Sequence, residues 1–143
     1  MYYIKIEESF DAAHFLSGYK GKCSNLHGHR WNVLVQVKGE DLNSDSNERG
    51  MLMDFSVLKN KLKEICDSFD HKFIYEKNTL KEETIKCLKD EGFELIELPF
   101  RPTAENLSMY FFEKLNLEKV DIDRVEVYET PNNCAIYENE SGR

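Results

Sequence analysis

The stretch HGHRWNVLVQVK, residues 27 to 38, carries a β-branched or aromatic residue at every second position from 31 to 37. This period of two is typical of a β-strand with one buried face. His27 and His29 continue the same face at the start of the stretch. The sequence therefore predicts a strand over residues 29–38, with two histidines on its buried side where it begins.

The residues before this stretch supply a second strand. Within residues 2–14 one face is again mostly apolar, with Glu8 as the exception, and it consists of Ile4, Ile6, Phe10, Ala12 and His14. A polar, glycine-containing loop, SGYKGKCSN (17–25), joins the two strands. We therefore expect a long hairpin whose connecting loop has a functional character.

Helical patterns fill the middle of the chain. Asp54 is placed to cap a helix that ends near residue 69. Thr79 and Glu82 have capping-box spacing, which predicts a helix over 80–91 that Gly92 ends. FELIEL (93–98) is a candidate short strand, and Thr103 can cap a third helix.

A second strand pair, DIDRVEVYET (121–130) and CAIYE (134–138), follows the helices. The order strand pair, helices, strand pair lacks βαβ alternation and favours an antiparallel α+β fold. The length of 143 residues and the hydrophobic content of 41% fit a single globular domain over residues 1–143.

Composition excludes several function classes. The apolar runs are too short to span a membrane, and the N-terminus lacks a signal-peptide pattern. Four cysteines without paired spacing are then expected to be reduced thiols in a cytoplasmic protein. The net charge of −8 argues against nucleic acid as a partner.

Acidic residues are unevenly distributed. None occurs between Asp11 and Glu40, although the average density would place about five there. The window instead holds four cations: Lys20, Lys22, Arg30 and Lys38. It is either a hairpin that happens to lack acids or a local pocket for an anionic ligand.

Three histidines are candidates for a metal site. On a strand, His27 and His29 point to the same side and can reach one ion. A hairpin would bring His14 beside them, and three imidazoles leave a fourth position open, as in catalytic zinc sites. The alternative is a set of core histidines satisfied by backbone carbonyls.

Further candidates carry acid–base chemistry. Cys23 is a potential thiolate base or nucleophile beside Lys22, or else a small buried side chain. Asp70 followed by His71 can form a carboxylate–imidazole pair for proton transfer. Glu129 shares a strand face with buried valines, so it either pairs with a cation or anchors a ligand with N–H donors.

Together these residues resemble the 6-pyruvoyltetrahydropterin synthase / 6-carboxytetrahydropterin synthase family. The resemblance spans residues 10 to 130 in the family's order. The matching pieces are FDAAH (10–14), CSNLHGH (23–29), MDF (53–55), DH (70–71), PTAEN (102–106) and YET (128–130).

The resemblance implies a role for each matching residue. Zinc would be bound by three ligands, His14, His27 and His29. The catalytic residues would be Cys23 as proton acceptor, with Asp70, His71 and Glu129 in a proton relay. Glu129 would also hold the pterin, with Thr103 and Glu105 lining its pocket. For the triphosphate our candidates are Lys20, Lys22 and Arg30, inferred from the acid-free window.

The resemblance also implies a fold and an activity. The fold would be of the tunnelling type, a four-stranded antiparallel sheet with helices on one face, in homo-oligomers that are commonly hexamers with sites between subunits. The spacing Cys-x3-His-Gly-His resembles the queuosine-pathway enzymes, which convert 7,8-dihydroneopterin triphosphate to 6-carboxytetrahydropterin, acetaldehyde and triphosphate. Residues 76–98 look like a helical insertion relative to shorter members.

The same residues allow other functions. Pyruvoyl formation could come from the same residues, and a non-catalytic zinc- or pterin-binding protein would keep the ligands without using Cys23 as a base. A cupin also uses an HxH pair, but the three expected helices and the missing later Pro-x-Gly segment count against it.

Overall fold

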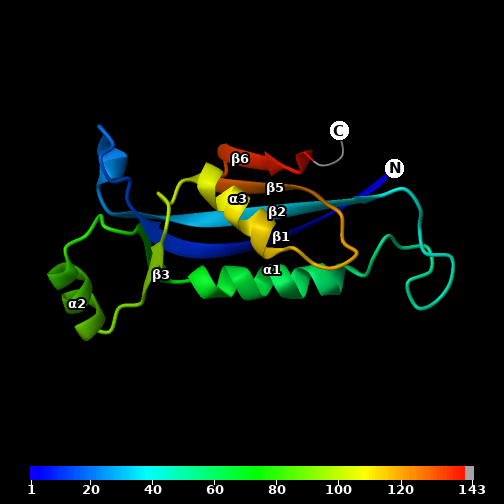
Figure 1. Cartoon of the computed structure of the whole chain (residues 1–143), viewed down its shortest axis with the longest axis horizontal. Helices are drawn as coiled ribbons and strands as arrows, with labels where there is room; N and C mark the ends of the chain where they lie inside the picture. Colours follow the sequence, from blue (N-terminus) through cyan, green and yellow to red (C-terminus); the bar gives the residue numbers. More distant parts are fainter. Residues whose placement is uncertain (141–143) are drawn as a thin grey trace.

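The computed structural model describes residues 1–140 and consists of one six-stranded sheet with helices packed on it (Figure 1). The strands lie in the order β4-β3-β1-β2-β5-β6. Their bounds are β1 Tyr2–His14, β2 His27–Gly39, β3 Lys72–Glu76, β4 Leu95–Leu98, β5 Ile122–Thr130 and β6 Asn133–Glu138. The α+β class is therefore confirmed, as are both strand pairs.

The expected antiparallel sheet of four strands is wrong in its number of strands and in part of its pairing. β1, β2, β5 and β6 do form an antiparallel set, but β3 and β4 extend it with parallel pairing to β1 and to each other. β3 was missed because it is only five residues long and follows the first helix after a single linking turn. At that turn His71 adopts a positive φ of 61°.

The hairpin of β1 and β2 fixes the relative positions of the candidate ligands. Its register is regular over 13 residue pairs, from Tyr2 opposite Gly39 to His14 opposite His27. One face buries side chains from both strands, as the period of two predicts, and these include Phe10 and Trp31. The histidines therefore lie at the closed end of a rigid ribbon.

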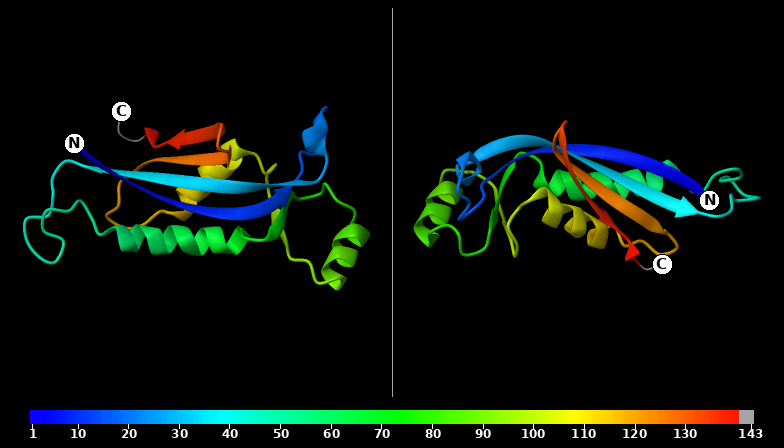
Figure 2. Two further views of the ribbon diagram at one scale, coloured as in Figure 1. Left: turned by 180° about the vertical axis from the view of Figure 1, so that it is seen from behind. Right: turned by 90° about the horizontal axis from the view of Figure 1, so that it is seen from above.

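Two helices cover the buried face of the sheet, as Figure 2 shows from above and behind. They are α1 (Phe55–Phe69) and α3 (Ala104–Lys114). Each begins at its predicted cap: the Asp54 carboxylate accepts from the N–H of Ser56 at 2.8 Å, and the Thr103 hydroxyl accepts from the N–H of Asn106 at 3.2 Å. Phe10, Phe69 and Phe111 pack together between sheet and helices.

The segment between β3 and β4 differs from its expected form. Helix α2 (Glu82–Asp90) is shorter than predicted and has no buried residue, and it lies beyond β3 at one end of the molecule (Figure 1). Thr79 does not cap it, because its hydroxyl donates to the carbonyl of Glu76 instead. Gly92 ends the helix region with a φ of 93°, as predicted. Whether residues 76–98 are an insertion stays a prediction.

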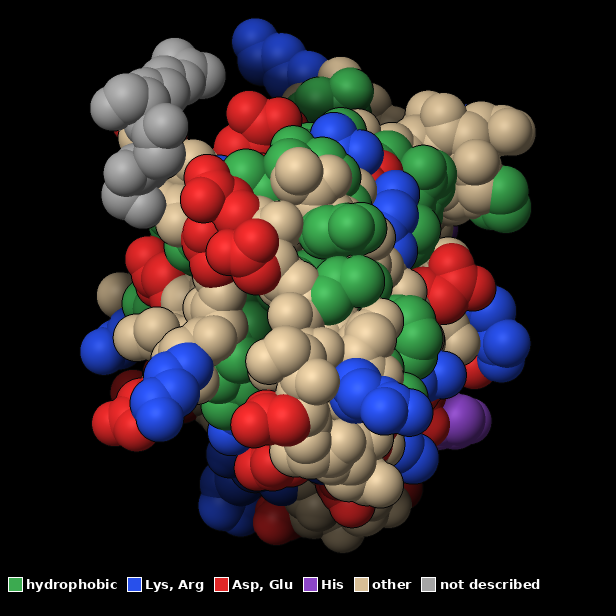
Figure 3. Space-filling model, turned by 90° about the vertical axis from the view of Figure 1, so that its right-hand side faces the viewer, with side chains coloured by type: hydrophobic (Ala, Val, Ile, Leu, Met, Phe, Trp, Pro, Cys, Tyr) green, Lys and Arg blue, Asp and Glu red, His purple; other side chains and the backbone are tan. Residues whose placement is uncertain are grey.

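At the opposite end, near the N-terminus, acidic and basic side chains are interspersed with apolar ones, so the net negative charge is not gathered on this face (Figure 3). No helix within residues 1–140 combines the length and the apolar character needed to cross a membrane.

Candidate metal centre and proton relay

Three histidines converge where β1 and β2 meet. His14 ends β1, and His27 and His29 open β2, so the hairpin register brings the three rings together. Their ring centroids lie 4.6 to 5.1 Å apart, and one nitrogen from each lies within 4.8 Å of the others. His14 is buried, with 1% of its surface exposed, whereas the other two are partly exposed.

Backbone carbonyls fix the tautomers of two rings. His14 Nδ1 lies 2.8 Å from the carbonyl of Pro102, and His27 Nδ1 lies 2.6 Å from the carbonyl of Asn25. A carbonyl only accepts, so both Nδ1 atoms carry the proton and donate it. In the neutral rings, both Nε2 atoms are then bare lone pairs, and they face each other at 3.1 Å.

This arrangement fits a metal ion. Two facing lone pairs repel unless a cation lies between them, and burial lowers the pKa of His14 to about 4, so a bound proton is unfavourable there at neutral pH. Zinc–nitrogen bonds of about 2.0 Å place two ligand nitrogens of a tetrahedral ion about 3.3 Å apart, close to the observed separation. The carbonyls that hold the Nδ1 protons also resemble the outer partners of metal-bound histidines.

His29 completes the set. Its Nε2 atom is buried and makes no hydrogen bond within the described residues, and it lies 3.3 Å from Oε1 of Glu129 on β5. Burial lowers the pKa of His29, with the nearby Glu129 carboxylate opposing the shift. An unpartnered imidazole nitrogen beside two others is a third ligand atom available to the same ion.

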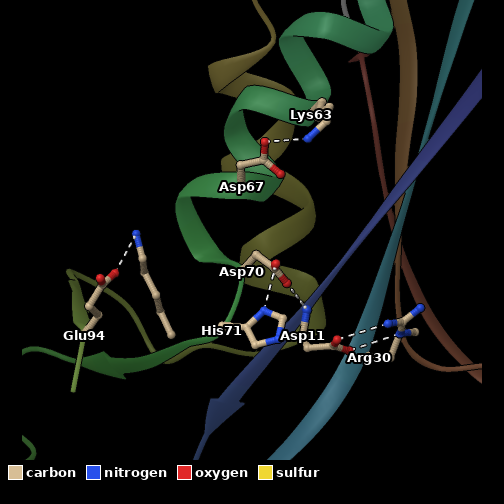
Figure 4. Close-up of polar contacts among 8 residues, drawn as sticks. Asp11, Arg30, Lys63, Asp67, Asp70, His71 and Glu94 are labelled. Carbon is tan, nitrogen blue, oxygen red and sulfur yellow. Dashed lines mark hydrogen bonds and ion pairs between the residues drawn. The ribbon is translucent and has the colours of Figure 1, made fainter. Parts of the chain in front are cut away.

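A second cluster contains the predicted carboxylate–imidazole pair (Figure 4). Asp70 directly follows α1, and its Oδ2 lies 2.8 Å from Nδ1 of His71, whose side chain is 79% exposed. The backbone N–H of Asp11 donates to Oδ1 of Asp70 at 2.9 Å, and this bond is the largest cause of the lowered pKa of Asp70. The structure thus holds an ionised carboxylate against an exposed imidazole, as a proton-transfer pair requires.

The two clusters lie on opposite faces of the hairpin. Side chains alternate along a strand, so Arg30 points away from the side of His29, and Asp11 points away from that of His14. Asp70 and His71 are bound to the backbone of Asp11 at the edge of β1. Within one chain, the Asp70–His71 pair and the three converging histidines therefore lie on opposite sides of the hairpin.

Cys23 and Lys22 lie together in the loop between the strands. They form a short 3-10 turn over Lys22–Ser24, where Cys23 is partly exposed and Lys22 exposed. The Cys23 thiol belongs to neither cluster of metal-ligating atoms among residues 1–140. Within the same residues Lys20 and Lys22 form no ion pair, whereas Lys38 pairs with Asp123 at 3.5 Å.

The two residues predicted from PTAEN occupy the start of α3. The Thr103 hydroxyl already serves as its cap, and Glu105 is exposed in its first turn. Within residues 1–140, neither Thr103 nor Glu105 forms a side-chain hydrogen bond or ion pair with the three converging histidines.

A cavity of about 600 Å³ lies beside the imidazole pair and is lined in part by Asp11, Arg30 and His71. Of the three converging histidines, His29 alone belongs to its lining. The larger apolar side chains of the lining are Leu26 of the loop, Phe73 of β3, Leu88 of α2, Phe93 after α2 and Leu95 of β4. Leu26 and Phe93 are more than 60% exposed, so the cavity opens broadly to solvent.

Sequence reasoning missed the main-chain partners of the site. The carbonyls of Pro102 and Asn25 orient two imidazoles, and the backbone of Asp11 holds Asp70. Because nearly every residue carries the same main-chain groups, residue types do not indicate which of these groups will contact a functional side chain. The side-chain pair of Asp11 and Arg30 could have been found, because it follows from the register once His14 is placed opposite His27.

Comparison with protein families matches residues 3–140 to the family described as 6-pyruvoyl tetrahydropterin synthase. A protein of Haemophilus influenzae named 6-carboxy-5,6,7,8-tetrahydropterin synthase is 38% identical, over 96% of this chain and 99% of its own length. One of Synechocystis with the same name is 34% identical, over 96% and 93%.

Solved structures agree in fold. An uncharacterised protein of Wolinella succinogenes superposes with a TM-score of 0.81 at 24% identity, over 97% of this chain and 98% of its own. The 6-pyruvoyl tetrahydropterin synthase of Caenorhabditis elegans superposes with a TM-score of 0.68 at 26% identity, over 97% and 96%. From the near-complete family match, the similarity to named relatives and the shared fold, we conclude that this chain belongs to the 6-pyruvoyl tetrahydropterin synthase family.

Proposed function

We propose that this protein is a zinc-dependent 6-carboxy-5,6,7,8-tetrahydropterin synthase of queuosine biosynthesis. It would convert 7,8-dihydroneopterin triphosphate to 6-carboxytetrahydropterin, acetaldehyde and triphosphate. The observation that carries the proposal is the convergence of three histidines, two of which, His14 and His27, face each other with unprotonated Nε2 atoms 3.1 Å apart. The names of the relatives from Haemophilus influenzae and Synechocystis support the carboxy product.

In this proposal His14, His27 and His29 hold the zinc ion. The bound ion supplies a Lewis acid that polarises side-chain oxygens of the substrate and stabilises developing negative charge. The carbonyl of Pro102 keeps the His14 ring oriented, and burial keeps that ring neutral and therefore able to bind a cation.

Cys23 removes a carbon-bound proton in the proposed reaction. It is partly exposed in a loop that also holds Lys20 and Lys22, and no acidic residue occurs from position 12 to position 39, so its thiol can be reached by an anionic substrate. His71 passes protons between side-chain positions of the substrate, and Asp70 holds the imidazole by its Nδ1 atom.

Glu129 holds the pterin through the 2-amino and ring N–H donors. Its carboxylate is partly buried and beside His29, so a planar ligand with paired N–H donors would satisfy it next to the metal. Thr103 and Glu105 line the pterin pocket in the proposal. Lys22, which has no ion-pair partner within residues 1–140, is our candidate for the triphosphate.

We further propose a homo-oligomer, a hexamer in the form common to the family, in which the imidazole pair of one copy serves the zinc site of another. The support is the placement of the two clusters on opposite faces of one hairpin. If one chain supplies the zinc ligands and another supplies the Asp70–His71 pair, the active site is complete only in the assembly.

Mass spectrometry of the products from zinc-loaded protein and 7,8-dihydroneopterin triphosphate tests the proposal. The proposed reaction predicts 6-carboxytetrahydropterin and acetaldehyde as the products. A pyruvoyl product would replace the proposed reaction with 6-pyruvoyltetrahydropterin synthesis while leaving the residue roles intact. Pterin binding without turnover by a folded, zinc-loaded oligomer would make the protein a binding protein and end the enzymatic proposal.

A further inference from the structure

An ion pair flanks the proton-transfer pair on the outer face of the hairpin. Asp11 of β1 lies directly opposite Arg30 of β2. The guanidinium donates from Nε to Oδ1 and from another nitrogen to Oδ2, both at 3.1 Å, which is the two-point geometry of a specific arginine–carboxylate contact (Figure 4).

The same aspartate also holds the proton-transfer pair through its main chain. Its N–H donates to Asp70, and its carbonyl accepts from the N–H of His71 at 2.6 Å. His71 has a left-handed backbone, uncommon for a residue with a side chain, so this bond stabilises a conformation that the chain alone disfavours. Both backbone groups of Asp11 point toward β3, while its side chain points to the outer face.

The Asp11 carboxylate is therefore close to the imidazole. One oxygen of Asp11, one oxygen of Asp70 and a ring nitrogen of His71 all lie within 4.8 Å of one another. Two carboxylates at this distance from one imidazole compete for its N–H and repel each other. Arg30 occupies both oxygens of Asp11 and neutralises its charge, which leaves Asp70 as the partner of His71.

We propose that Arg30 is a positioning residue: by binding the Asp11 carboxylate it keeps the His71 imidazole on Asp70, in one orientation. This inference rests on the proposed function for its catalytic consequence, but not for the orientation itself. It also removes Arg30 from the candidates for binding the triphosphate, because its charge is already compensated.

The test compares Arg30→Met with the double variant Asp11→Asn/Arg30→Met. The single change leaves a charged Asp11 beside His71, whereas the double change removes both charges. Because the Arg30 side chain is 73% exposed, both variants should fold, which thermal unfolding checks. Lys86→Met is the matched control, since it removes a similarly exposed cation that pairs with Asp90 on α2 and has no hydrogen bond or ion pair with Asp11 or Asp70 among the described residues.

The first readout needs no activity. Long-range proton–nitrogen spectra of protein labelled with 15N-histidine report which ring nitrogen is protonated and hydrogen-bonded, and His71→Gln assigns the signal among four histidines. We expect Arg30→Met to shift the His71 nitrogen signals and the double variant to restore them. Unchanged signals in Arg30→Met, or a double variant that is as shifted as the single one, would overturn the inference.

The second readout is the split between kcat and KM. We expect Arg30→Met to lower kcat about tenfold with KM nearly unchanged, and the double variant to recover most of that loss, because the relay works again. A KM that rises alike in both variants would assign Arg30 to substrate binding and reject the positioning role. If the wild type is inactive while the spectra respond as expected, the proposed function fails and the positioning role stands.

Discussion

The buried His14 makes the stability of the metal-free protein depend on pH in a calculable way. Its pKa is about 4 in the folded chain, against 6.5 in the unfolded one, because burial disfavours the charged ring. The folded state therefore binds fewer protons than the unfolded state between these values. This contribution to stability is complete above about pH 6.5 and is lost as the pH falls toward 4.

The magnitude follows from linkage. Between about pH 7.5 and about pH 5, the two pKa values give a loss of about 2 kcal/mol, within a full loss of about 3 kcal/mol below pH 4. The carboxylates with lowered pKa values, Asp54 and Asp70, remain ionised over most of this window, whereas His29, whose pKa is also lowered by burial, adds a loss of the same sign. The share of His14 is therefore measured against a variant that lacks only this imidazole. For a chain of this size the loss corresponds to a shift of about 1 M in the urea midpoint.

Urea unfolding of chelator-treated protein at the two pH values measures this shift. His14→Asn is the comparison, because its amide can donate to the Pro102 carbonyl in place of Nδ1 but does not titrate. The variant should lose about 2 kcal/mol of the pH dependence. An equal pH dependence in wild type and variant would refute the burial of a neutral His14, and with it the account of the facing Nε2 atoms.

Three further outcomes follow from the same geometry. Cys23→Ala should bind pterin with unchanged affinity and form no product, as measured by fluorescence titration and mass spectrometry; weakened binding would assign the thiol to the pocket. Mixing inactive His27→Ala and inactive His71→Ala chains should restore activity to about a quarter of the sites, if each site combines two copies at random; no recovery after subunit exchange would place both groups in one chain. Phe111→Ala should destabilise the protein by about 3–5 kcal/mol in urea unfolding, because Phe111 is fully buried against Phe10 and Phe69; a loss below 1 kcal/mol, roughly that of a surface change, would contradict the packing.

The hairpin could be predicted from the sequence because its signal is local. Alternation over residues 2–14 and 29–38 fixes which side chains face inward, and that in turn puts His14, His27 and His29 on one side. The helix caps Asp54 and Thr103 could be predicted equally well, since an N-cap depends only on one side chain and the three residues that follow it.

The sheet edge could not be predicted in the same way. β4 confirms the short strand predicted within FELIEL (93–98), but β3 was not predicted. The partners of both strands lie far away in the sequence and pair with them in parallel, so no local turn indicates the pairing. Thr79 had the spacing of a cap, but a hydrogen bond to the Glu76 carbonyl competes for its hydroxyl. His29 and His71 lie on opposite faces because of this tertiary arrangement. The candidate residues could therefore be predicted from the sequence, but the face on which each of them lies could not.

The three-histidine metal site is tested most directly by a zinc titration of metal-free protein, with bound metal and product formation measured on the same samples. If the three histidines hold the catalytic ion, activity should rise in proportion to bound zinc and stop at one ion per chain. His27→Ala and His29→Ala should then bind little zinc and form no product. Full turnover without metal, or one tightly bound zinc ion in a chain lacking His14, His27 and His29, would show that these histidines do not hold a catalytic ion.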